Sequence, residues 1–189
     1  MENKAWAKTL LEIYKYLETI CNSIDDLVKK ASMSGYGCYG NSVRYTAEKI
    51  LDLTYKKQKL INIKVLIEDS LSKLSNENIK ILTLFYIDGV KAKDLSSMYN
   101  INIRTLFRRK SIALSKLAEL FKLNGFTNSK LKNMLINEHW IMHIYENNLS
   151  FLSSKCKKLE PELNYKIILN NAINELKKFA KQKNVANYY

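Results

Sequence analysis

The stretch Asp94–Leu117 has the sequence DLSSMYNINIRTLFRRKSIALSKL, and it predicts two short helices joined by a tight turn. The first helix is expected over residues 93–99 and the second over residues 103–122. Asn100 can take the positive φ angle that a tight turn often needs, and Asn102 is placed to cap the second helix. The side chains expected to face inward are Leu95, Met98, Tyr99, Leu106, Ala113, Leu117 and Leu120.

Basic side chains are concentrated in the same part of the chain. Residues 91–122 hold eight Lys or Arg against two acidic residues, and the whole 189-residue chain has a net charge of +13. Three of the four arginines lie in this window, and arginine suits bidentate recognition of phosphate and guanine. A helix-turn-helix unit of this kind usually places its second helix in the major groove of DNA. We therefore expect double-stranded DNA as the partner, in preference to a basic face that only contacts solvent.

Position along the second helix indicates a role for each side chain. Arg104 and Arg108 are four residues apart at its N-terminal end, on the face that usually touches base edges. Ile103 and Phe107 lie beside them, where an apolar side chain could meet a thymine methyl or a sugar. Phosphate contacts are expected farther along the helix, from Arg109 and Lys110.

Amphipathic helices are expected on both sides of this unit. In residues 4–31, apolar side chains recur every three or four positions, at Trp6, Leu10, Ile13, Leu17, Ile20, Ile24, Leu27 and Ala31. The wide apolar face favours packing within one chain, and a coiled-coil homodimer is the alternative. Further helices are expected over residues 43–74, 76–87, 128–158 and 165–179. With five glycines and one proline for turns, the sequence predicts an all-α fold: long amphipathic helices around a central helix-turn-helix unit.

The pattern suggests three regions. Residues 1–73 form a helical region for packing or dimerisation, residues 74–125 hold the helix-turn-helix unit, and residues 126–189 form a C-terminal helical region. No run of about 18 apolar residues occurs, so we expect no membrane span. Early charged residues argue against a signal peptide, and three cysteines without a CxxC pair fit reduced thiols. A cytoplasmic location is expected.

The sequence holds no clear signal for catalysis. No nucleophile motif, close carboxylate pair or nucleotide-binding loop is evident, so neither enzyme activity nor a cofactor is expected. His139 and His143 have the spacing of two metal ligands, and Cys156 is a candidate third ligand of a metal sensor. The segment HWIMH lacks the catalytic glutamate of metalloproteases, and packing or surface histidines are the favoured interpretation. No metal site is therefore predicted.

Residues 74–117, LSNENIKILTLFYIDGVKAKDLSSMYNINIRTLFRRKSIALSKL, resemble region four of bacterial sigma factors, the domain that reads the −35 promoter element. An apolar helix ends at Tyr86 and is followed by Asp88-Gly89-Val90. The later matches are Asp94-Leu95-Ser96 where the family usually has Glu-Ile-Ala, Asn100-Ile101-Asn102 where it often has Gly-Ile-Ser, Thr105-Leu106 for Thr-Val, and Ala113-Leu114 with Leu117 for Ala-Leu and a final Leu. The resemblance covers about a quarter of the chain.

This resemblance implies roles for individual residues. The base-reading positions fall on Ile103, Arg104, Thr105 and Arg108, and the backbone-contacting positions fall near Lys91, Lys93, Asn102 and Lys110. Ile103 replaces a position that is often polar, so the family's DNA sequence is not carried over. Residues 1–73 do not resemble a promoter-melting domain, and about 65 residues follow the helix-turn-helix region, residues 74–125. The chain is more similar to the sigma-like regulators of phages and Gram-positive bacteria.

The sequence therefore predicts a sequence-specific DNA-binding transcription regulator. The alternative is a protein–protein adaptor that binds RNA polymerase or another regulator through its helices. Salt separates the two, because binding through several phosphates weakens steeply as salt is added.

Overall fold

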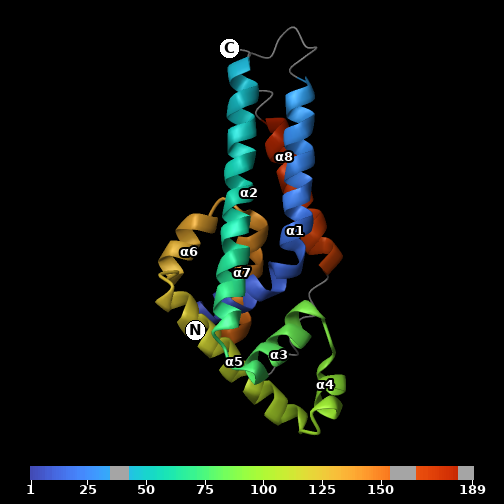
Figure 1. Ribbon diagram of the computed structural model, residues 1–189, viewed down its shortest axis with the longest axis vertical. Coiled ribbons are helices and arrows are strands. Elements are labelled where there is room, and N and C mark those ends of the chain that lie inside the picture. Colours follow the sequence, from blue (N-terminus) through green and yellow to red (C-terminus); the bar gives the residue numbers. More distant parts are fainter. Residues whose placement is uncertain (35–42, 154–164, 183–189) are drawn as a thin grey trace. The chain divides into compact units, whose positions relative to one another are not determined.

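The computed structural model describes residues 1–34, 43–153 and 165–182, and all regular structure in these ranges is helical (Figure 1). The elements are α1 (Glu2–Ser34), α2 (Val43–Ser72), α3 (Asn76–Leu82), the π-helical segment η1 (Thr83–Ile87), α4 (Ala92–Met98), α5 (Ile103–Leu123), α6 (Asn128–Leu135), α7 (His139–Ser153) and α8 (Tyr165–Gln182). The predicted all-α class is confirmed. None of the helices in the described ranges has the length and apolar character needed to cross a membrane.

Residue contacts divide the chain into two compact units. The first unit comprises Met1–Lys15 and Ile63–Pro161, and the second comprises Tyr16–Asn62 and Glu162–Tyr189. The helix-turn-helix unit lies wholly in the first. These units do not share the boundaries of the three regions expected from sequence, because the long helices α1 and α2 each contribute residues to both units.

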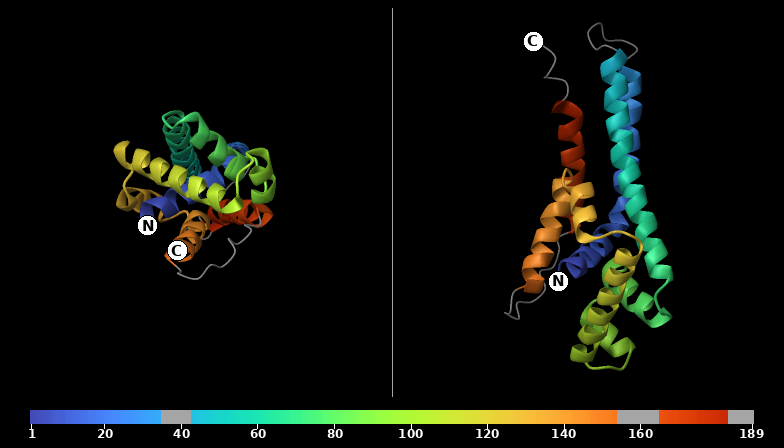
Figure 2. Two further views of the ribbon diagram at one scale, coloured as in Figure 1. Left: turned by 90° about the horizontal axis from the view of Figure 1, so that it is seen from below. Right: turned by 90° about the vertical axis from the view of Figure 1, so that its left-hand side faces the viewer.

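The second unit contains the later part of α1, the earlier part of α2, and α8. The two long helices run side by side here (Figures 1 and 2), and Lys57 Nζ lies 2.7 Å from Asp25 Oδ1. The ammonium of Lys56 lies 4.9 Å from the ring centroid of Phe179 on α8.

Every apolar residue of the predicted repeat in α1 is buried except Leu27, which is half-buried. The repeat therefore marks an apolar stripe that serves as core.

In the first unit, the start of α1 is fastened to α6 and α7 by aromatic stacking and hydrogen bonds. Trp6 is fully buried, and its ring stacks on Tyr145 with centroids 4.0 Å apart. Its Nε1–H donates to Asn128 Oδ1 over 2.7 Å, and the Tyr145 hydroxyl donates to the same oxygen over 3.2 Å. Burial raises the pKa of Tyr145, and the negative charge of Glu2 raises it further.

A buried polar cluster lies close to this stack along α1 and α7. Asn148 Nδ2 donates to Thr9 Oγ1 over 3.0 Å and to Glu12 Oε2 over 2.6 Å. Lys8 Nζ lies 3.7 Å from Glu12 Oε1 and 4.8 Å from the ring centroid of Phe151. The buried carboxylate of Glu12 is thus both paired with Lys8 and hydrogen-bonded by Asn148, and the cluster links α1 to α7.

The helix expected over residues 128–158 is two helices instead of one within the described residues. α6 ends at Leu135, α7 begins at His139, and Figure 2 shows the two as separate helices. The turn between them holds Asn137 but no glycine or proline, so the sequence gives only a weak breaking signal there. The buried face also shifts around the helix axis between α6 and α7. In one straight helix, Trp140 and Ile141 would not lie on the same face as Leu131 and Leu135, yet all four are buried.

Candidate nucleic-acid interface

Helices α4 and α5 form the predicted helix-turn-helix unit, and the turn has the expected chemistry. Asn100 has a φ angle of +47°, a conformation that asparagine adopts more readily than most residues. Ser96 Oγ donates to the Ile101 carbonyl over 2.6 Å and so closes the turn. Asn102 Oδ1 accepts a hydrogen bond from the Arg104 backbone N–H over 2.8 Å, which confirms that Asn102 caps α5.

Side chains from α3, α4 and α5 together build the core of the helix-turn-helix unit. Leu95, Leu106, Ala113 and Leu117 are buried as predicted. Met98 is 67% exposed, so its predicted inward position is wrong; the two-turn helix α4 buries only Leu95. Leu120 is half-buried. The buried face of α5 is wider than expected because it also includes Leu114, Ala118 and Phe121.

The first two turns of α5 present the side chains expected to read bases. Arg104 and Arg108 are exposed, Ile103 is 43% exposed, and Thr105 is half-buried. Their grouping follows from the helix itself, because residues three and four positions apart share a face. These exposed positions are geometrically free to contact a ligand.

Two of the expected phosphate-binding lysines lie near the start of α4. Lys91 occupies the N-cap position of α4 and Lys93 lies in its first turn, and both are exposed. Asn102 is exposed as well, but its amide oxygen is engaged in the cap of α5. A phosphate contact from Asn102 would therefore use its side-chain NH₂ group or a nearby backbone N–H.

Arg109 is directed toward α3. Its guanidinium forms an ion pair with the carboxylate of Glu77, in the first turn of α3, and both side chains remain partly exposed. The charge of Arg109 is thus partly compensated inside the unit. The predicted phosphate contact of Arg109 would have to compete with this ion pair. The sequence does not indicate the pair, because Glu77 and Arg109 are 32 positions apart.

Lys110 requires a correction. It is only 6% exposed, and its ammonium lies 4.6 Å from the ring centroid of Phe85, 4.8 Å from that of Tyr86 and 5.6 Å from that of Phe107. We call these four residues the Lys110 cage. The predicted phosphate contact does not fit a buried side chain whose charge is directed at aromatic faces. The sequence did hold a signal: Lys110 falls between Leu106 and Ala113 in the buried stripe of α5.

The π-helical segment η1 supplies two of the three rings in the Lys110 cage. Its wider turn is shown by Asp88 N–H, which donates to the Thr83 carbonyl five residues earlier over 3.0 Å. Gly89 follows with a φ angle of +68°, as expected for the residue that ends this helix. The rings of Phe85 and Phe107 are 6.2 Å apart, so η1 and α5 contact each other through the cage.

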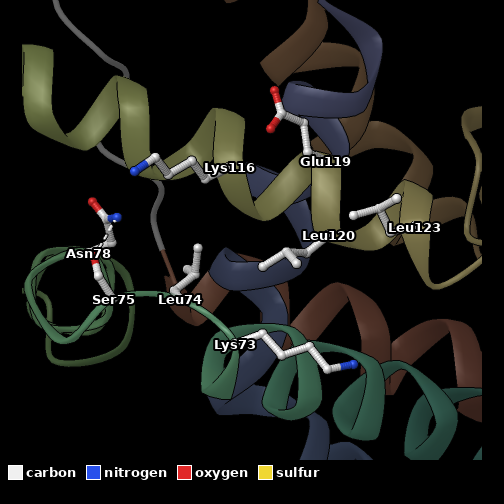
Figure 3. Close-up of a pocket in the computed structure, with 8 residues that line it drawn as sticks. All are labelled: Lys73, Leu74, Ser75, Asn78, Lys116, Glu119, Leu120 and Leu123. Atoms are coloured by element: carbon white, nitrogen blue, oxygen red, sulfur yellow. Dashed lines mark hydrogen bonds between the residues drawn. The ribbon is translucent and has the colours of Figure 1, made fainter.

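A pocket of about 270 Å³ lies elsewhere on the same unit, beside the C-terminal half of α5 (Figure 3). It is lined by Lys73, Leu74, Ser75, Asn78, Lys116, Glu119, Leu120 and Leu123. Lys116 extends toward Asn78 and Ser75, and Leu123 at its rim is 79% exposed (Figure 3). The lining of the pocket combines three leucines with the charged side chains of two lysines and one glutamate.

The two histidines considered as metal ligands are exposed on α7. His143 Nδ1 is 3.3 Å from Asn147 Nδ2. Within the described ranges, no three His, Cys, Asp or Glu side chains gather as a metal site would require. Cys156, the candidate third ligand, lies outside those ranges.

Comparison of the chain with known protein families, with curated proteins and with solved structures finds no match to any of them.

Proposed function

We propose that this protein is a sequence-specific DNA-binding transcription regulator that inserts the N-terminal end of α5 into the major groove. The observation that carries the proposal is the exposed pair Arg104 and Arg108 on the capped second helix of a helix-turn-helix unit. Guanidinium groups at this position can donate two hydrogen bonds to a guanine edge. The resemblance of residues 74–117 to region four of sigma factors supports the same role.

The charge distribution on α4 and α5 agrees with this role. Lys91 and Lys93 are exposed at the start of α4, and they could hold phosphates while Arg104 and Arg108 contact base edges. Contacts to phosphate would fix the position of α5 without conveying sequence. Lys110 would contribute from inside, by holding α5 against η1 through the Lys110 cage.

The test is to measure binding of arginine variants to duplexes selected from a random pool. Arg104→Ala and Arg108→Ala should each cost on the order of 1–3 kcal/mol in binding and relax the sequence preference. Arg44→Ala is a matched control, because Arg44 is exposed on α2 and pairs with Glu48 at 3.0 Å. Unchanged binding in the double variant Arg104→Ala/Arg108→Ala would contradict the proposal.

One observation favours the alternative, an adaptor that binds RNA polymerase or another regulator. The pocket beside α5 is lined in part by Leu74, Leu120 and Leu123, and a concave site with an apolar lining can receive a partner's side chain. Binding through this surface should change little with salt, whereas DNA binding through several phosphates should weaken steeply. Measuring affinity for duplex DNA and for polymerase over a salt series separates the two functions.

A further inference from the structure

The end of α5 that carries Arg104 and Arg108 also exposes two large apolar side chains. Ile103 is 43% exposed and Phe107 is 42% exposed, and they are four residues apart. Residues with this spacing are neighbours on a helix surface, so the two form a short apolar row directly beside the arginine row. This row, next to the arginines of α5, would lose water favourably against an apolar partner.

Phe107 is held in place from its inner side. Its ring centroid lies 6.2 Å from that of Phe85 and 5.6 Å from Lys110 Nζ. Lys110 is itself buried, and its ammonium contacts Phe85 and Tyr86 as well. The ring of Phe107 therefore cannot turn inward without displacing the other members of the Lys110 cage, and its exposed part is held in a defined position.

DNA offers one apolar group on the base edges of the major groove, the C5 methyl of thymine. We propose that Ile103 and Phe107 read thymine methyl groups, and that Lys110 and Phe85 act as positioning residues for Phe107. This inference rests on the proposed function and specifies what α5 recognises: thymines next to the bases that Arg104 and Arg108 contact. The arginines draw the helix to the duplex, and the apolar row then loses water against the methyl groups.

Uracil provides the test, because it has the hydrogen-bonding groups of thymine but lacks the methyl. The full chain is titrated with a duplex selected from a random pool, and then with duplexes in which each thymine is replaced by deoxyuridine, one at a time. Loss of one contacted methyl should weaken binding about fourfold, the effect of exposing one buried CH₂-sized group. Thymines that α5 does not contact should show no change.

Protein variants assign each affected thymine to a side chain. Ile103→Ala and Phe107→Ala should each abolish the uracil effect at one position and leave it at the other. Lys110→Met should abolish it only at the position assigned to Phe107, a selectivity that a general loss of stability would not produce. Ile112→Ala is the matched control, because Ile112 is 47% exposed farther along α5 and should leave both effects intact.

The outcomes distinguish this inference from the proposed function. If uracil duplexes bind as tightly as thymine duplexes while the selected site is still preferred, methyl readout is overturned and DNA recognition stands. Equal weakening of thymine and uracil duplexes by Ile103→Ala and Phe107→Ala would also overturn it. If no duplex is preferred over any other, both the inference and the proposed function fail.

Discussion

Replacement of Trp6 tests whether the first residues of the chain belong to the unit that holds the helix-turn-helix. Trp6→Ala removes a fully buried side chain that stacks on Tyr145 at 4.0 Å and donates to Asn128. Truncation of a buried tryptophan typically costs about 3–5 kcal/mol, and the lost stacking and hydrogen bond fall within that figure. Asn128 Oδ1 keeps its second donor, the Tyr145 hydroxyl, so no further penalty is expected.

We therefore expect Trp6→Ala to lower the free energy of unfolding by about 4 kcal/mol. Trp6→Phe keeps much of the apolar contact but loses the indole N–H, so it should cost about 1–2 kcal/mol. Urea denaturation followed by far-ultraviolet circular dichroism measures both values. At roughly 2–4 °C of melting temperature per kcal/mol for a chain of this size, Trp6→Ala should also melt about 8–16 °C lower.

Leu123→Ala serves as the control, because Leu123 is 79% exposed in the same unit. Its effect should stay within about 0.5 kcal/mol of the unchanged protein. The packing of α1 against α6 and α7 would be refuted if Trp6→Ala cost no more than this control. A cost confined to Trp6→Ala, with Trp6→Phe intermediate, is the expected order.

Two further predictions concern the turn and a tyrosine. Asn100→Ala should lower the free energy of unfolding by about 1 kcal/mol, because alanine is strained at a φ angle of +47°. Asn100→Gly should lower it by less, since glycine adopts a positive φ angle readily. Urea denaturation measures both variants, and equal stability of the two would contradict this prediction. Burial raises the pKa of Tyr145 above its ordinary value of 10.0, so its contribution to stability is present below pH 10 and is lost as the pH rises through the higher folded-state pKa. The phenolate absorbance of the native protein minus that of Tyr145→Phe should therefore titrate above pH 10; titration below pH 10 would refute the raised pKa.

Local features of the fold were predictable from the sequence because their causes lie within a few residues. The positive φ angle of Asn100, the cap by Asn102 and the left-handed Gly89 all depend on the side chain at that position and its near neighbours. The apolar repeat of α1 likewise predicted its buried stripe, since helical periodicity follows from spacing alone. The sequence does not predict the break between α6 and α7, because no glycine or proline lies there.

Some features of the candidate site are likewise predictable from the sequence, and others depend on tertiary packing. Sequence placed Arg104 and Arg108 on one exposed face, because that needs only a helix and its boundaries. Whether a cation is available for a ligand depends on what packs against it from elsewhere. Arg109 meets Glu77 only because α3 packs on α5, and charge counting along the sequence could not show this pair.

The sequence by itself determined that the chain is helical, that it turns at Asn100, and that the start of α5 bears arginines. Only the tertiary structure decided which aromatic rings surround the Lys110 ammonium and that Phe107, 42% exposed, packs against them. The physical reason is that helix and turn formation respond to neighbouring residues, whereas the Lys110 cage is assembled by packing η1 against α5. Burial of a charge depends on such partners, and they come from residues distant in the sequence.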